Sequence, residues 1–175
     1  SPLERVAAWD AAGNHDEAVN ELARGVRAGD AHCTRLLGLR LLTGDRAPWL
    51  PAEGLRFLDD ACSQGLPEAA SRAAAIVALG VRMAANWPLA LELLRKSAAA
   101  GWAPAQRQLL ALCDDRELAR RQAEGRADWK ALSAAVDLAG WRRAPAADVR
   151  SQEPRVSLFP GMLRPEICQF FISMT

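Results

Sequence analysis

The sequence has no tyrosine and few of the residues that favour strands. Valine, isoleucine and threonine together account for 14 of the 175 residues, whereas alanine alone accounts for 36. Strands favour β-branched and aromatic side chains, and alanine and leucine favour helices. This composition excludes a large sheet and predicts a helical protein. Half of the residues are hydrophobic and 25% are charged, as in an ordinary folded domain.

Long apolar runs and an excess of one charge are also missing. No apolar run reaches the roughly 18 residues that a membrane span needs, and no secretory signal opens the chain. Lysine and arginine total 22 against 21 aspartates and glutamates, so the net charge is +1. Such a balance provides no field that would gather nucleic acid or anionic lipid. We therefore expect a cytoplasmic protein that binds neither nucleic acid nor membranes.

Residues that hold metals or carry out catalysis are scarce. The four cysteines lack Cys-x-x-Cys spacing, and we expect them to be buried thiols. The only histidines are His15 and His32. His15-Asp16-Glu17 has the spacing of two metal ligands, but the start of a helix explains these acidic residues better. No phosphate loop, dinucleotide fingerprint or nucleophile elbow is present. We expect no catalytic residue and no metal site in this chain.

What the sequence does contain is a period of 36 residues. Gly29, Gly65 and Gly101 are separated by this interval, and so are the members of several apolar rows. The rows are Val19-Leu55-Leu91, Leu22-Leu58-Leu94, Val26-Cys62-Ala98, Cys33-Ala69-Ala105 and Leu37-Ala73-Leu109. A fixed period of this length is typical of a solenoid, because one repeat cannot bury its apolar face alone.

Each period carries the start and stop signals of two helices. In the middle period, Leu55, Leu58 and Cys62 lie on one helical stripe, after which Gly65 ends the helix and Pro67 opens the next. The predicted helices span residues 3–12, 15–28, 31–43, 51–64, 67–83, 88–100, 103–123 and 127–139. The expected fold is all-α. It is an α-solenoid of three to four antiparallel helix pairs with a short C-terminal strand-helix tail. Small residues such as Gly38, Ala69 and Ala105 would let paired helices approach closely.

The first repeat resembles a tetratricopeptide helix pair, with the sequence GNHDEAVNELARGVRAGDAHCTRLLG. A Gly-x-x-x-Ala-x-x-x-Leu/Ala pattern on the 36-residue spacing resembles the Sel-one-like subfamily of these repeats. The pattern occurs at Gly29-Cys33-Leu37, Gly65-Ala69-Ala73 and Gly101-Ala105-Leu109. The resemblance covers roughly residues 3–139. It implies a scaffold that binds proteins or peptides and has no catalysis of its own.

The composition changes after Gly140. Residues 141–155 are polar and contain proline, which predicts a linker between a repeat domain at 1–140 and a separate segment at 156–175. The last segment has strand character at RVSLF, a turn at Pro160-Gly161 and an amphipathic helix from Pro165 onward. It is either the truncated start of a downstream domain or a strand and helix that cap the repeats.

That segment, VSLFPGMLRPEICQFFIS, resembles the opening of the catalytic domain in prolyl-4-hydroxylase-type oxygenases that depend on Fe(II) and 2-oxoglutarate. Metal ligands in that family form a His-x-Asp pair with a distant histidine, and a basic residue binds 2-oxoglutarate. This chain has no His-x-Asp, so we expect no cofactor in it. If an oxygenase domain follows, the resemblance implies Fe(II) and 2-oxoglutarate there, with ascorbate as a further candidate.

The tetratricopeptide resemblance also implies that the first helix of each pair lines the binding face. The candidate residues on that face are Arg35, Leu39, Arg72, Arg107 and Gln108. Arginine binds carboxylates and carbonyls, so the expected partner is a protein or peptide, the chain's own downstream catalytic domain included. The alternative is a solvated helix face without a partner.

These observations predict a non-catalytic, protein- or peptide-binding helical repeat domain. The C-terminal resemblance makes it the N-terminal region of a prolyl-4-hydroxylase-like dioxygenase, with the catalytic residues beyond Thr175. The alternative is a stand-alone repeat adaptor or scaffold whose C-terminal tail serves as a cap.

Overall fold

The computed structural model describes residues 1–125 and 128–173, without the side chains of residues 123 and 124. Contacts within the chain group it into two compact units, residues 1–106 and residues 107–175. The predicted boundary between a repeat domain at 1–140 and the linker that follows it stays a prediction.

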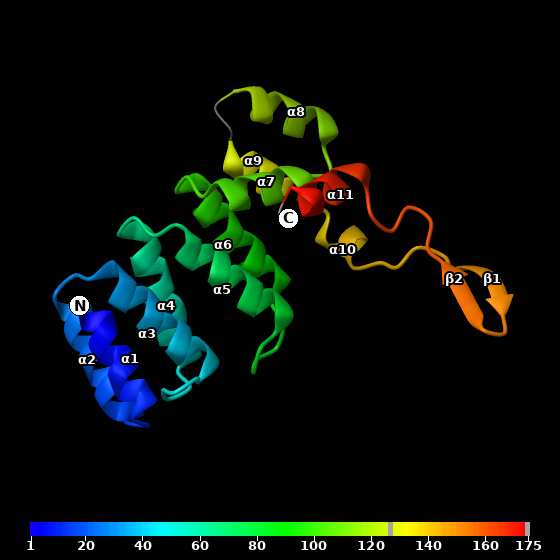
Figure 1. Cartoon of the computed structure of the whole chain (residues 1–175). Coiled ribbons are helices and arrows are strands. Elements are labelled where there is room, and N and C mark those ends of the chain that lie inside the picture. Colours follow the sequence, from blue (N-terminus) through cyan, green and yellow to red (C-terminus); the bar gives the residue numbers. More distant parts are fainter. Residues whose placement is uncertain (126–127, 174–175) are drawn as a thin grey trace. The chain divides into compact units, whose positions relative to one another are not determined.

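The first unit is built from helices paired along the chain (Figure 1). Their bounds are α1 (Pro2–Ala11), α2 (His15–Arg27), α3 (Ala31–Thr43), α4 (Pro51–Ser63), α5 (Glu68–Leu79) and α6 (Trp87–Ala99). Helix α1 packs on α2, α3 on α4 and α5 on α6, and the pairs are joined by packing of α2 on α3 and of α4 on α5. This arrangement confirms the expected all-α solenoid of helix pairs.

The 36-residue period is visible in the backbone and in the core of this unit. Glycines one period apart follow the second helix of each pair with φ between 78° and 96°: Gly29, Gly65 and Gly101. Glycine adopts this left-handed conformation without steric cost, which is why it ends these helices. One leucine row of the period is at most 5% exposed: Leu22, Leu58 and Leu94. The repeat in the sequence is therefore a repeat of helix ends and of buried positions.

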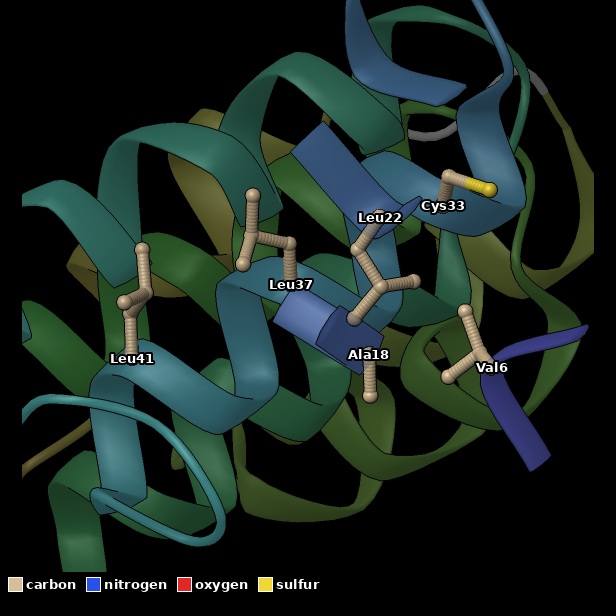
Figure 2. Close-up of a cluster of buried hydrophobic side chains, with 6 residues drawn as sticks. All are labelled: Val6, Ala18, Leu22, Cys33, Leu37 and Leu41. Atoms are coloured by element: carbon tan, nitrogen blue, oxygen red, sulfur yellow. The ribbon is translucent and has the colours of Figure 1, made fainter. Parts of the chain in front are cut away.

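Figure 2 shows a cluster of buried side chains contributed by α1, α2 and α3. Its members are Val6, Ala18, Leu22, Cys33, Leu37 and Leu41. Burial, assisted by the nearby charge of Asp30, raises the pKa of the Cys33 thiol to about 11. Cys33 is therefore a small core residue and not a reactive thiolate. Cys62 and Cys113 are buried too, as predicted, whereas Cys168 is half-buried.

Helices α3 and α4 approach each other closely at two glycines. A Cβ atom at Gly38 would lie 2.9 Å from Cγ of Leu58, so the predicted close approach at this residue is confirmed. A Cβ atom at Gly54 would lie 2.5 Å from the backbone nitrogen of Leu42 and 2.8 Å from the carbonyl oxygen of Gly38. The two backbones thus touch at positions that no larger residue can occupy without a shift of a helix.

The second unit begins within α7 (Ala103–Leu112) and contains short helices and a hairpin. The elements are α8 (Arg116–Glu124), α9 (Trp129–Ala134), α10 (Leu138–Trp141), β1 (Asp148–Gln152), β2 (Arg155–Leu158) and α11 (Pro165–Ile172). Strands β1 and β2 pair antiparallel, with Asp148 opposite Leu158, Gln152 opposite Arg155 and a bulge between Val149 and Ser151. The predicted strand-helix tail is present as β2 and α11.

Two of the predicted helices extend too far. The helix predicted at 67–83 ends at Leu79, because Gly80 takes φ 69° in the left-handed region. The helix predicted at 103–123 is broken into α7 and α8, because the side chain of Asp115 accepts a hydrogen bond of 2.8 Å from the backbone N–H of Leu118 and starts a new helix. An N-terminal cap at Asp115 thus separates two helices that helical periodicity alone would join.

The region after α8 also differs from its prediction. The helix predicted at 127–139 is two short helices, α9 and α10, each capped by an aspartate, Asp128 and Asp137. Its predicted first residue, Ala127, lies outside the described residues, as does Met174 at the end of the tail. Within the predicted linker at 141–155, residues Asp148–Gln152 form β1. Pairing with β2 gives this polar segment the strand structure that its composition does not indicate.

Candidate binding surface

Exposed side chains recur at helical spacing on α5. Arg72, Ala75 and Leu79 are all exposed, and 76% of the surface of Leu79 is accessible. Residues at i, i+3 and i+7 lie on one face of a helix, so these three form a single surface, which we call the α5 stripe. Arg72 makes no hydrogen bond or ion pair with any residue that the structure describes. The α5 stripe therefore offers a cation without a partner among the described residues and, two turns further along the same face, an exposed apolar side chain.

The corresponding face of α3 is less open. Leu39, one period before Ala75, is half-buried. Arg35 is half-buried as well, and its Nε is buried without a hydrogen-bond partner among the described residues. Arg35, Leu39 and Arg72 thus belong to the first helices of consecutive pairs within one unit, as the sequence predicted.

The other two predicted residues belong to the second unit. Arg107 on α7 is exposed and has no hydrogen bond or ion pair within the described part of the chain. Gln108 is half-buried. One continuous face that contains all five candidates therefore stays a prediction.

Arg107 lines a groove of 680 Å³ between α7, α8 and α11 in the second unit. Sequence reasoning missed most of the groove, including Arg116 and Arg120 on α8 and Phe170 on α11. The spacing of four residues between Arg116 and Arg120 places both on one face of a helix. A single helix at 103–123 would place Arg107, nine residues before Arg116, on the opposite face, so the sequence did not group Arg107 with these two arginines.

Arg164 holds the start of α11 against the end of α7. Its guanidinium donates to Oδ1 of Asp114 at 2.6 Å and to the carbonyl oxygens of Ala111 and Leu112 at 3.1 and 3.2 Å. These carbonyls belong to the last turn of α7, where a helix leaves its acceptors unpaired. The guanidinium also lies over the ring of Trp141, 4.4 Å from the ring centroid. One arginine therefore fixes one wall of the groove.

The first unit contains a buried ion pair that ties α1 to α3. Arg40 donates to both carboxylate oxygens of Asp10, and the side chains of Arg40 and Asp10 are 8% and 10% exposed. Nδ1 of His15 lies 3.2 Å from Asp10, and Arg46 lies 3.6 Å from it. Burial opposes ionisation of Asp10, but hydrogen bonds from Arg40 and His15 and the charges of Arg40 and Arg46 outweigh it and lower the pKa of the carboxyl.

The residues that the structure describes do not fit the iron centre that the oxygenase resemblance implies. The described residues include no group of three histidine, cysteine, aspartate or glutamate side chains placed to hold a metal. His15 is engaged with Asp10, and His32 is an exposed residue in the first turn of α3. An iron-dependent reaction would need ligands from elsewhere.

Among the described helices, none is long and apolar enough to cross a membrane.

Comparisons with known proteins find likenesses among solved structures. No protein-family model matches the chain, and no curated protein matches it. Among solved structures, a Sel1 repeat protein from Oxalobacter formigenes is 26% identical and superimposes with a TM-score of 0.45, covering 66% of this chain and 86% of that chain. At this TM-score the likeness adds nothing to the assignment of the fold, which rests on the chain's own helix pairs.

Proposed function

We propose that this chain is a non-catalytic helical repeat domain of the Sel-one-like type that binds a protein or peptide through the first helices of its pairs. The α5 stripe carries the proposal. Leu79 is 76% exposed, and Arg72, two helical turns away on the same face, is exposed and has no hydrogen bond or ion pair among the described residues. Together they supply an apolar contact and a charge-assisted hydrogen bond to a partner. Half-buried Leu39 and Arg35 extend the same kind of surface on α3.

Reversing the charge and removing the leucine of the α5 stripe should weaken partner binding. We expect the double variant Arg72→Glu, Leu79→Ser to lose at least tenfold in affinity for a protein that the wild-type chain retains from a lysate of its native cells. Hydrogen bonds to charged groups contribute about 1.5–3 kcal/mol, and burial of a leucine contributes a similar amount. Quantitative mass spectrometry of the retained proteins, followed by titration with the purified partner, measures the loss.

The matched control is Arg56→Glu, the same charge reversal on the exposed face of α4, the second helix of a pair. It should leave partner binding unchanged. Circular dichroism should show both variants folded, because exposed positions contribute little to folding. If the double variant keeps every partner while Arg56→Glu loses them, the binding face lies on the second helices. If neither variant changes binding, the α5 stripe is not a binding surface.

A second proposal concerns the chain as the N-terminal region of a prolyl-4-hydroxylase-like dioxygenase that takes Fe(II) and 2-oxoglutarate. The observation that favours it is an accumulation of exposed apolar side chains around the turn and helix of the tail. Phe159, Leu163, Phe171 and Ile172 are 44%, 52%, 54% and 63% exposed. Apolar surface of this kind is usually covered by another part of a protein. A stand-alone adaptor would leave it in water.

The coding sequence beyond Thr175 tests this second proposal. We expect it to encode a His-x-Asp followed by a distant histidine and a basic residue. Calorimetry should then detect stoichiometric Fe(II) binding by the longer protein and none by residues 1–175, because this chain does not provide the ligands. A coding sequence that stops near Thr175, or Fe(II) bound by residues 1–175, would refute the proposal.

A further inference from the structure

We propose that the groove between α7, α8 and α11 binds an acidic peptide segment that carries one large apolar side chain. This proposal rests on the proposed function, namely that the chain binds protein segments. It adds the chemistry of one such segment. It concerns residues of the second unit, so it can fail while binding at the α5 stripe stands.

The charges around the groove are mostly positive. Arg107, Arg116 and Arg120 line it, against a single carboxylate, Glu166. Glu166 lies 3.9 Å from Arg116, and Glu117 pairs with Arg120 at 2.9 Å, so Arg107 is the cation of the lining without an ion pair among the described residues. The exposed guanidinium of Arg107, with that of Arg116 in the same groove, pairs well with a carboxylate of a ligand. The charge that complements this lining is negative.

Two of these arginines have donors to offer a ligand. Arg107 is exposed and makes no hydrogen bond or ion pair with the described residues. Arg116 donates from Nη2 to the carbonyl oxygen of Leu110 at 3.4 Å, whereas its Nε is buried without a partner. The Nη1 atom of Arg116 lies 3.9 Å from Glu166, too far for a hydrogen bond. It can therefore donate to a carboxylate of a ligand.

The remaining lining is mostly apolar, apart from Gln169 and Ser173. Leu110 and Phe170 are half-buried, and Ala111 and Ala119 are 7% and 8% exposed. A volume of 680 Å³ accommodates several side chains of a ligand. Alanines at the floor leave room, and Phe170 offers a ring against which an apolar side chain packs. The occupant that matches this lining therefore has an apolar side chain between carboxylates.

The groove is formed before a ligand arrives. The contacts of Arg164 with Asp114 and with the last carbonyls of α7 hold the start of α11 in place. Pro165 and Glu166, which line the groove, follow Arg164 directly. A preformed site loses little free energy to ordering when a peptide binds.

Selection from a random library of ten-residue peptides displayed on phage tests the proposal. The whole chain is immobilised, and the selected peptides are synthesised with a fluorescent label for anisotropy titration. We expect the selected peptides to carry at least two acidic residues near one large apolar residue. Arg107→Glu should weaken their binding at least tenfold, and replacing the apolar residue of the peptide with serine should weaken it by a similar factor. Binding should also weaken as salt is added.

The matched control is Arg143→Glu, the same charge reversal at an exposed position of the second unit outside this groove. It should leave the peptide affinity within twofold of the wild type. Arg72→Glu, on the α5 stripe, should leave it unchanged as well. Peptides that bind equally to wild type and Arg107→Glu but are lost with Arg72→Glu would overturn the groove proposal and support the proposed function.

Three other results would overturn the proposal. One is a set of selected peptides that are neutral or basic. Another is an equal loss of affinity with Arg107→Glu and Arg143→Glu, which would show only a general effect of net charge. The third is complete competition by inorganic phosphate or by a single-stranded oligonucleotide at the peptide's own concentration, which would assign the groove to phosphate-bearing ligands.

Discussion

Leu58→Ala should lower the free energy of unfolding by about 2–5 kcal/mol, measured by urea denaturation. Leu58 is 0% exposed and lies where α4 meets Gly38 of α3. Its removal leaves a cavity between two helices whose backbones already touch, so the helices cannot move closer to fill it. A repeat domain depends on contacts between neighbouring helices, and a domain is typically stable by about 5–15 kcal/mol. The loss is therefore a large fraction of the total.

The control for this prediction is the same change at Leu79, where the side chain is 76% exposed. Leu79→Ala should alter stability by less than about 0.5 kcal/mol, because the leucine is already in water and alanine is a good helix former. Equal losses at Leu58 and Leu79 would contradict the burial described for the leucine row. A loss below about 1 kcal/mol at Leu58 alone would mean that the helix pair closes over the cavity.

The sequence could predict the repeat because the repeat is local. The spacing of residues along the chain predicts the helix ends at Gly29 and Gly65 and the buried row through Leu58. This spacing can be read without knowing how the helices pack. The row through Leu58 has a leucine in all three periods. The sequence could not predict that α7 and α8 are separate helices, since the break depends on one side-chain cap, that of Asp115.

The candidate surfaces were predictable only in part, for a related reason. Arg72 and Arg107 were identified because the first helix of each pair follows from the period. The groove at Arg107 depends on α11, which lies more than fifty residues further along the chain and is held there by Arg164. No periodic signal connects the two segments. The pairing of Arg40 with Asp10 was missed too, although Arg40 interrupts a row in which the next two periods have Ile76 and Leu112.

Asp10→Asn should cost about 3–5 kcal/mol of stability at pH 7, because it leaves Arg40 as a buried charge without its counter-ion. Asp10 has a pKa below its ordinary value of 3.8 in the folded chain, so folding favours the ionised form. Its contribution is complete above the ordinary value and is lost as the pH falls through the lower, folded value. The difference between wild type and variant should therefore be largest near neutrality and should shrink below pH 3.8. Urea denaturation at a series of pH values measures both effects.

Two further variants separate the ion pair from the other groups around Asp10, which are His15 and Arg46. Asp45 is an exposed carboxylate in the loop between α3 and α4. Asp45→Asn should change the free energy of unfolding by less than about 0.5 kcal/mol. Combining Asp10→Asn with Arg40→Met should cost less than the sum of the two single changes, because no buried charge is then left unpaired. Additive losses, or a difference from wild type that stays constant between pH 7 and pH 2, would show that α1 is held to α3 by packing around Val6 and Leu37 and not by this pair.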